Sequence, residues 1–192
     1  MKSKIEQLIR ESIETKKLLL EPAQVAVVEK IAGAIIKAYE NKKKVIIFGN
    51  GGSAADSQHF AAELVCRFEV NRRALAAISL TTDTSIITAT GNDFSFDNIF
   101  SRQVEALVNT GDVAIGITTS GNSPNVIKAL EQAKKQNAVT IGFTGNKECR
   151  IKEITDLCFC APSGVTGRIQ ECHGLVIHVI CSLVEGALFG KK

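Results

Sequence analysis

Five short apolar runs, each followed by a helical pattern, constrain the fold of this 192-residue chain more than any other feature. Runs that are apolar at nearly every position are typical of parallel strands buried on both faces. Their alternation with helices predicts an α/β fold, a doubly wound five-stranded parallel sheet flanked by helices. The predicted strands are residues 45–48, 76–80, 113–117, 139–143 and 157–160.

Residues 1–41 precede the first strand and carry apolar side chains at helical spacing. Pro22 interrupts the pattern, so we expect an N-terminal helical pair joined there and used in oligomerisation. Residues 44–192 should form the sheet core and a C-terminal helix, and residues 1–192 a single domain. The last helix, about 168–189, is apolar nearly all round, which favours burial at a subunit interface over burial in the core.

Composition narrows the range of partners. A net charge of +3 from 23 basic and 20 acidic residues leaves no polybasic segment, so we expect no nucleic-acid partner. The first residues lack the apolar run of a signal peptide or membrane span, which predicts a cytoplasmic protein with no membrane partner. We expect the six cysteines to stay reduced there, as small buried side chains.

The first predicted strand ends in a glycine-rich loop, 49–53, directly before a helix. Glycine lets the backbone approach a ligand, and Ser53 with Asp56 has the spacing of a capping box. A tight turn that binds nothing has the same composition, and the loop lacks the lysine of a Walker loop. We interpret the loop as an anion site, because a helix begins there.

The second loop, 118–124, follows the third predicted strand and contains three hydroxyl residues before Ser123 and Pro124. Ser123 is the expected N-cap and Pro124 the expected first helical residue. Capping alone would leave the other hydroxyls unexplained. We therefore expect a phosphate site where the two loops meet at the carboxyl edge of the sheet.

His59 and Glu63 are four residues apart on one predicted helix face, where they could share a metal ion or a substrate. On the last helix, Gln170 and His178 are separated by about 12 Å along the axis and about 80° around it. If both serve one site, either Gln170 precedes the helix or neighbouring subunits contribute. This spacing favours a site built at an interface.

Two further candidates carry charge. Asp93 lies in the polar segment 91–97, where it could hydrogen-bond sugar hydroxyls or cap a turn. Arg67 follows Glu63 by four residues, so it could pair with that carboxylate or neutralise a substrate phosphate.

Taken together and in chain order, these segments resemble the phosphoheptose isomerases, which have the sugar isomerase (SIS) fold. The segments that carry the resemblance are residues 49–53, 59–64, 91–94, 119–123 and 168–171, with His178. The resemblance implies isomerisation of sedoheptulose 7-phosphate to D-glycero-D-manno-heptose 7-phosphate. In bacteria this would be the first step of ADP- or GDP-heptose biosynthesis, which supplies lipopolysaccharide and related glycans.

The resemblance also implies a cytoplasmic homotetramer with one Zn²⁺ per subunit, held by His59, Glu63, Gln170 and His178. Glu63 and His178 would be the acid/base pair. A carboxylate bound tightly to zinc is a poor base, so we expect Glu63 to be loosely ligated or to shift when substrate binds.

The substrate would be held by residues matched to the family one by one. Hydroxyls for the phosphate come from Ser53, Thr119, Ser120 and Ser123, and contacts to the sugar from Asn50, Arg67 and Asp93. The same site would include Gly51, Gly52, Glu63, Asn92, Thr118 and Gln170. Thr118 stands where relatives have serine, and it keeps the hydroxyl.

A non-catalytic relative with the same fold is the alternative: a tetrameric regulator of replication initiation that binds the initiator protein. Such a regulator would lack the equivalents of Glu63 and His178, and both are present here. A sugar-phosphate-sensing domain is less favoured, since those domains are attached to a DNA-binding or synthase partner.

Overall fold

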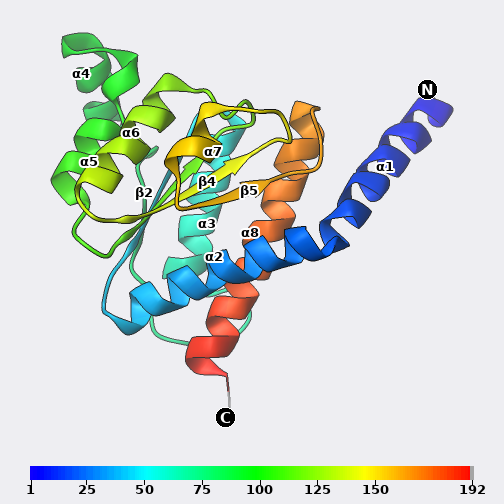
Figure 1. Ribbon diagram of the computed structural model, residues 1–192, viewed down its shortest axis with the longest axis horizontal. Coiled ribbons are helices and arrows are strands. Elements are labelled where there is room, and N and C mark those ends of the chain that lie inside the picture. Colours follow the sequence, from blue (N-terminus) through cyan, green and yellow to red (C-terminus); the bar gives the residue numbers. More distant parts are fainter. Residues whose placement is uncertain (191–192) are drawn as a thin grey trace.

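The five apolar runs form one parallel sheet in the computed structural model, which describes residues 1–190 (Figure 1). The strand order is β2-β1-β3-β4-β5, which confirms the doubly wound fold class. β2 is shorter than expected, and Ile78 is partly exposed there because β2 lies at the edge of the sheet. The strands are β1 (Val45–Gly49), β2 (Ala77–Ser79), β3 (Val113–Ile117), β4 (Val139–Thr144) and β5 (Leu157–Cys160).

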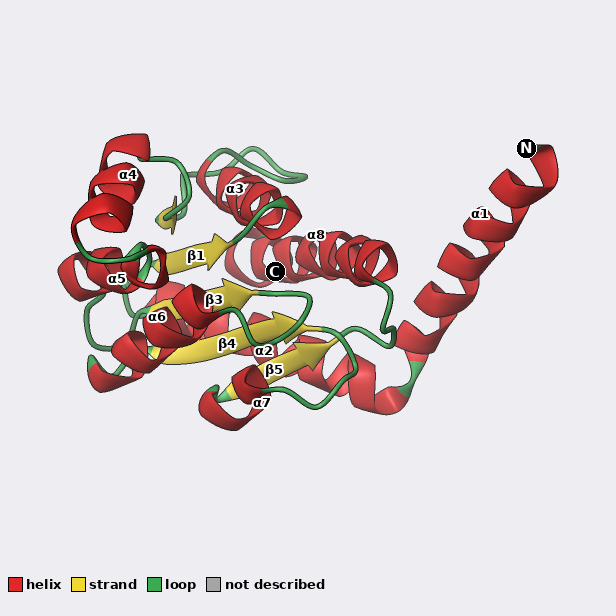
Figure 2. Ribbon diagram, turned by 90° about the horizontal axis from the view of Figure 1, so that it is seen from above, coloured by secondary structure: helices red, strands yellow, loops and turns green. Residues whose placement is uncertain are grey.

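Helices cover both faces of the sheet (Figure 2). Alternate strand residues point to opposite faces, so Ile47 and Ile115 pack against one helical layer, whereas Ile46 and Phe48 pack against the other. The first layer contains α2 (Pro22–Glu40), α3 (Gly52–Val65) and α8 (Thr166–Phe189). The second contains α4 (Thr84–Asp93), α5 (Ser101–Leu107), α6 (Pro124–Lys135) and α7 (Arg150–Ile154), with a short 3-10 turn at Phe96–Asn98.

Helix α8 is buried along one stripe and exposed along another. Its core stripe includes Ile177 and Ile180, whereas Leu175, Val179 and Leu183 are 40%, 41% and 46% exposed. One stripe of α8 is thus buried in the core of the chain, and burial of the other stripe at a subunit interface stays a prediction. By length and composition α8 could also cross a membrane, but a helix that packs in the core of a soluble protein can have the same length and composition.

The first two helices form as expected on either side of Pro22, and α1 (Lys2–Lys17) leads through the turn Leu18–Leu20 into α2. Figures 1 and 2 both show α1 projecting away from the sheet and its helices. None of its residues is buried. Polar contacts join it to α8, such as the bond from Arg168 Nη1 to the carbonyl of Leu8.

All six cysteines are free thiols. Cys172 and Cys181 are buried, as expected, but Cys66 is exposed and the other three are half-buried. The expectation of burial is thus correct for two of them, both on the core side of α8.

Candidate active site

Three predicted side chains converge at one point on the surface. Nε2 of His59 lies 2.9 Å from Oε1 of Glu63 and 3.3 Å from Nε2 of His178. The ligand atoms of the three residues all lie within 4.8 Å of one another. Two imidazole nitrogens and one carboxylate oxygen at this spacing match the donor set of catalytic zinc sites, so the residues present fit a divalent metal.

The triad forms because α3 and α8 run side by side in the same direction (Figure 1). His59 and Glu63 lie one turn apart on α3, and His178 faces them from α8. The ring of Phe68, just beyond α3, packs against the ring of His178 with centroids 5.4 Å apart. The three ligand atoms therefore meet within one chain, without a residue from a second subunit.

Gln170 occupies a different part of the site. It lies inside α8, so the alternative that it precedes the helix is wrong. Its side-chain amide lies so close to Gly52 that a Cβ at that position would collide with it. Gly52 precedes His59 by seven residues, about 10 Å along α3. Gln170 and His178 are therefore about as far apart along α8 as their partners, Gly52 and His59, are along α3. Gln170 lies at the end of α8 that is nearer the two loops.

The first loop turns sharply after β1. Gly51, with φ of 57°, is the N-cap of α3, a conformation that glycine adopts without strain. The capping-box prediction is wrong, because Ser53 lies within the first turn and its side chain makes no cap bond. Asp56 is not part of a cap either. One of its carboxylate oxygens is buried without a hydrogen-bond partner in residues 1–190, and burial raises its pKa although His59 lowers it.

The second loop is stabilised by its own hydroxyls. Ser123 is the N-cap of α6 and Pro124 its first residue, as predicted, but the Ser123 hydroxyl does not cap the helix. It lies 2.8 Å from Oγ1 of Thr118, which is also 3.3 Å from Oγ of Ser120. A polar cavity of about 280 Å³ adjoins this loop, lined by Thr119, Ser120, Asn122, Gly145, Lys147, Glu148, Ser163, Gly164, Thr166 and Ile169.

The two loops are joined by a pair of reciprocal hydrogen bonds. The amides of Asn50 and Asn125 each donate to the other's oxygen at 2.9 Å. Asn125 also accepts from the N–H of Val126 and is 2% exposed. Asn125 is not predicted from the sequence, because an asparagine in the first turn of a helix is ordinary. Its partner lies 75 residues earlier.

Three predicted residues have no hydrogen bond or ion pair to the triad within residues 1–190. Because α3 ends at Val65, Arg67 is not on the same helix as Glu63, and it forms no ion pair among the described residues. Asn92 and Asp93 form the end of α4 and are hydrogen-bonded to each other. Asp93 lines a shallow hollow between α4 and α5, in the layer on the opposite face of the sheet.

Known proteins resemble this chain over nearly its whole length. The model of the SIS domain family matches residues 9–145. A phosphoheptose isomerase of Aquifex aeolicus is 54% identical over 96% of both chains. The solved structure of a phosphoheptose isomerase from Francisella tularensis has a TM-score of 0.90 at 35% identity and covers 95% of this chain and 96% of that one. One from Neisseria gonorrhoeae has a TM-score of 0.87 at 40% identity, covering 96% and 98%.

Proposed function

The chain belongs to the SIS domain family and, within it, to the phosphoheptose isomerases, and we propose that it converts sedoheptulose 7-phosphate to D-glycero-D-manno-heptose 7-phosphate. The observation that carries this proposal is the convergence of His59, Glu63 and His178 beside two loops suited to a phosphate. The relatives are isomerases, so the comparisons do not favour the alternative, a non-catalytic regulator. The product would enter bacterial heptose biosynthesis.

Substrate phosphate would lie at the carboxyl edge of β1 and β3, where α3 and α6 begin. Backbone N–H groups at helix N-termini attract anions, and the hydroxyls of Ser53, Thr119, Ser120 and Ser123 add uncharged donors. The Asn50–Asn125 pair would hold the two loops at a fixed separation. The phosphate would thereby orient the sugar chain toward the triad.

Glu63 and His178 would move the protons. Carbonyl transfer from C2 to C1 requires the loss of one proton from C1 and the gain of one at C2. We assign both carbon-bound proton transfers to the Glu63 carboxylate, and the transfers at the O1 and O2 oxygens to His178. A divalent metal held by His59, Glu63 and His178 would supply Lewis-acid polarisation of the carbonyl. Gln170 would contact the substrate, or reach the metal after a side-chain shift.

We also propose that the protein assembles as a cytoplasmic homotetramer. Helix α1 exposes Ile5, Leu8, Ile9 and Ile13, at 52%, 41%, 54% and 48%. An apolar groove of about 480 Å³ lies nearby between α2 and α8, with Val25, Leu175, Val179 and Leu183 in its wall. Helices from other subunits could cover these surfaces, and could bring Asn92, Asp93 and Arg67 to a neighbouring triad. Sedimentation equilibrium at micromolar protein should give four chains, and a monomer would contradict the assembly.

Turnover tests the function directly. Purified protein should form aldose from sedoheptulose 7-phosphate, lose this activity after chelation and regain it when Zn²⁺ is restored. His178→Ala should stay at least about 100-fold less active than wild type with Zn²⁺. A wild-type protein that forms no product from any ketose phosphate, with or without metal, would refute the proposal.

A further inference from the structure

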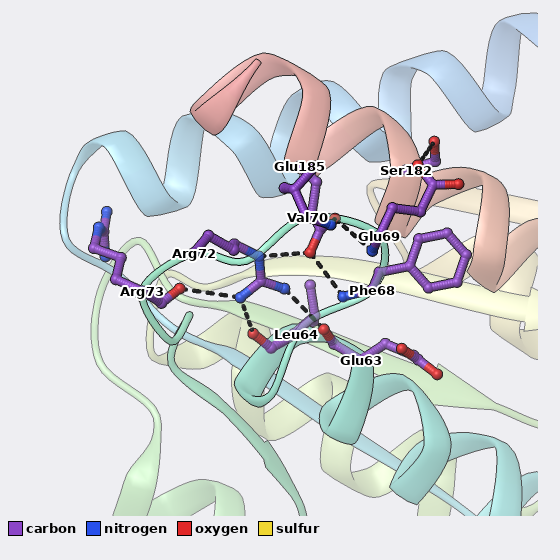
Figure 3. A network of polar contacts seen from close by, with 9 residues as sticks. All are labelled: Glu63, Leu64, Phe68, Glu69, Val70, Arg72, Arg73, Ser182 and Glu185. Atoms are coloured by element: carbon purple, nitrogen blue, oxygen red, sulfur yellow. Dashed lines mark hydrogen bonds and ion pairs between the residues drawn. The ribbon is translucent and has the colours of Figure 1, made fainter. Parts of the chain in front are cut away.

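A buried ion pair lies just beyond the triad, where α3 ends (Figure 3). Nε of Arg72 donates to Oε1 of Glu185 at 2.7 Å, and the two side chains are 1% and 3% exposed. Glu185 also accepts the backbone N–H groups of Phe68, Glu69 and Val70 at 2.7, 2.8 and 3.0 Å. Burial alone would raise its pKa, but these donors outweigh burial and lower the pKa to about 2. The carboxylate is therefore charged and fully bonded.

Arg72 also donates to carbonyls at the end of α3. Nη2 donates to the carbonyl of Glu63 at 2.8 Å, and Nη1 to the carbonyl of Leu64 at 2.9 Å. The last carbonyls of a helix have no partner within the helix. Arg72 supplies such partners in the turn that carries the Glu63 side chain, and so restrains its backbone.

Glu185 reaches the other side of the triad. It lies seven residues after His178, two turns further along the same face of α8. The N–H that it holds most closely belongs to Phe68, whose ring packs against His178. One carboxylate thus connects the helix that carries His178 with the loop that supports its ring.

We propose that Arg72 and Glu185 are positioning residues, which fix the relative placement of Glu63 and His178 so that the triad is preformed. The proposal deepens the function proposed above and rests on it. Partners that orient metal ligands without touching the metal typically contribute 10- to 100-fold to metal affinity or activity. A buried ion pair that only stabilised the fold would leave metal affinity unchanged in the folded variant.

The chain offers a matched control in a second buried ion pair, which joins the segments before β1 and β3. Asp112 is as buried as Glu185, accepts from Lys44 Nζ at 2.6 Å, and accepts the backbone N–H groups of Lys44 and Asn109. These bonds join only the segments before β1 and β3, and none of them involves α3, α8 or the loop that follows α3. Loss of charge at Asp112 therefore perturbs a similar network that is not bonded to the elements carrying the triad.

The test compares Glu185→Gln with Asp112→Asn in the full-length protein. Thermal unfolding measures the stability of both, and chelator competition measures their Zn²⁺ affinity, with kcat and KM followed separately. We expect similar losses of stability, but a 10- to 100-fold loss of Zn²⁺ affinity and of kcat in Glu185→Gln alone, with KM changed less than threefold. Phe68→Leu keeps every backbone donor to Glu185 and should lower Zn²⁺ affinity by a smaller factor, so it serves if Glu185→Gln does not fold.

Wild-type Zn²⁺ affinity and kcat in folded Glu185→Gln, or in Phe68→Leu when Glu185→Gln is unfolded, would overturn the positioning role. An equal loss in Asp112→Asn would do the same, because the effect would then follow stability alone. A wild-type protein that neither binds Zn²⁺ nor turns over a ketose phosphate would instead refute the proposed function.

Discussion

Two histidines five residues apart on α8 have opposite environments. His173 is completely buried, with its ring against Phe143 and Phe159, and burial lowers its pKa to about 4. His178 points about 140° away around the helix, toward His59 on α3. Nothing in the immediate sequence separates the two. The neighbouring elements decide that one imidazole is part of the core and the other is available for chemistry.

The largest difference should appear in activity. His178→Ala should lower kcat by about 10²- to 10⁴-fold, the usual contribution of a general acid or base. Its stability should change by less than about 1 kcal/mol, since the ring is not in the core. Steady-state kinetics and thermal unfolding of the same preparation measure both effects. Wild-type kcat in this variant would show that His178 has no role in catalysis, unlike the difference expected between the two histidines.

Replacement of the buried histidine should give the reverse result. His173→Ala leaves a cavity beside two phenylalanines, which should lower the free energy of unfolding by about 3 kcal/mol. Denaturant unfolding measures this loss. Turnover per folded molecule should stay within threefold of wild type at low temperature, and a larger decrease would show that the two faces of α8 are not independent.

The pH dependence of stability sharpens the same comparison. The pKa of His173 is lowered from 6.5 to about 4 in the fold, so below pH 6.5 the unfolded chain binds a proton that the folded one does not. Stability should be unaffected by this group above pH 6.5 and should fall by up to about 3 kcal/mol as pH decreases to 4.

His173→Leu should lack this part of the pH dependence when its unfolding free energies are compared with wild type. Parallel curves of unfolding free energy for wild type and His173→Leu between pH 6.5 and 4 would contradict the assignment to His173.

Glu185 affects stability in a lower pH range. Its pKa is lowered from 4.5 to about 2, so its stabilisation is present above pH 4.5 and is lost as pH falls toward 2.

The smallest expected effect concerns Gly52. In Gly52→Ala the new Cβ displaces the end of the Gln170 side chain, which should raise KM for the sugar phosphate about tenfold, or about 1.4 kcal/mol. The matched control is Gly33→Ala on α2, where a Cβ meets nothing within 4 Å. The control should stabilise the helix by about 0.5–1 kcal/mol and leave KM unchanged. An equal KM in both variants would place Gln170 outside the substrate site.

Much of the fold could be predicted because its signals are local. Apolar runs located all five strands to within two residues at either end, and Pro22 and Pro124 marked the start of α2 and α6. The prediction that Ser53 caps α3 is wrong because the N-cap is Gly51, two residues earlier. The preference for serine or threonine at an N-cap does not indicate a glycine there.

The site was predictable only in part, for the same reason. His59 and Glu63 share a helix, so their spacing is visible in the sequence. His178 is a candidate by residue type on another helix, and only the resemblance predicts that it joins them in one site. The bonds between Asn50 and Asn125, and between Arg72 and Glu185, join residues 75 and 113 positions apart. The spacing of residues in the sequence does not reveal such pairs, because the topology of the sheet brings them together.

Helix α1 has a consequence for measurements on dilute protein. Sixteen residues without a buried side chain form only a marginal helix in water, since nucleation is costly and packing supplies most helical stability. Its helical order would then depend on contacts with other subunits. Far-ultraviolet circular dichroism should lose intensity on dilution, before the sheet unfolds, because the helix content of α1 would fall with protein concentration.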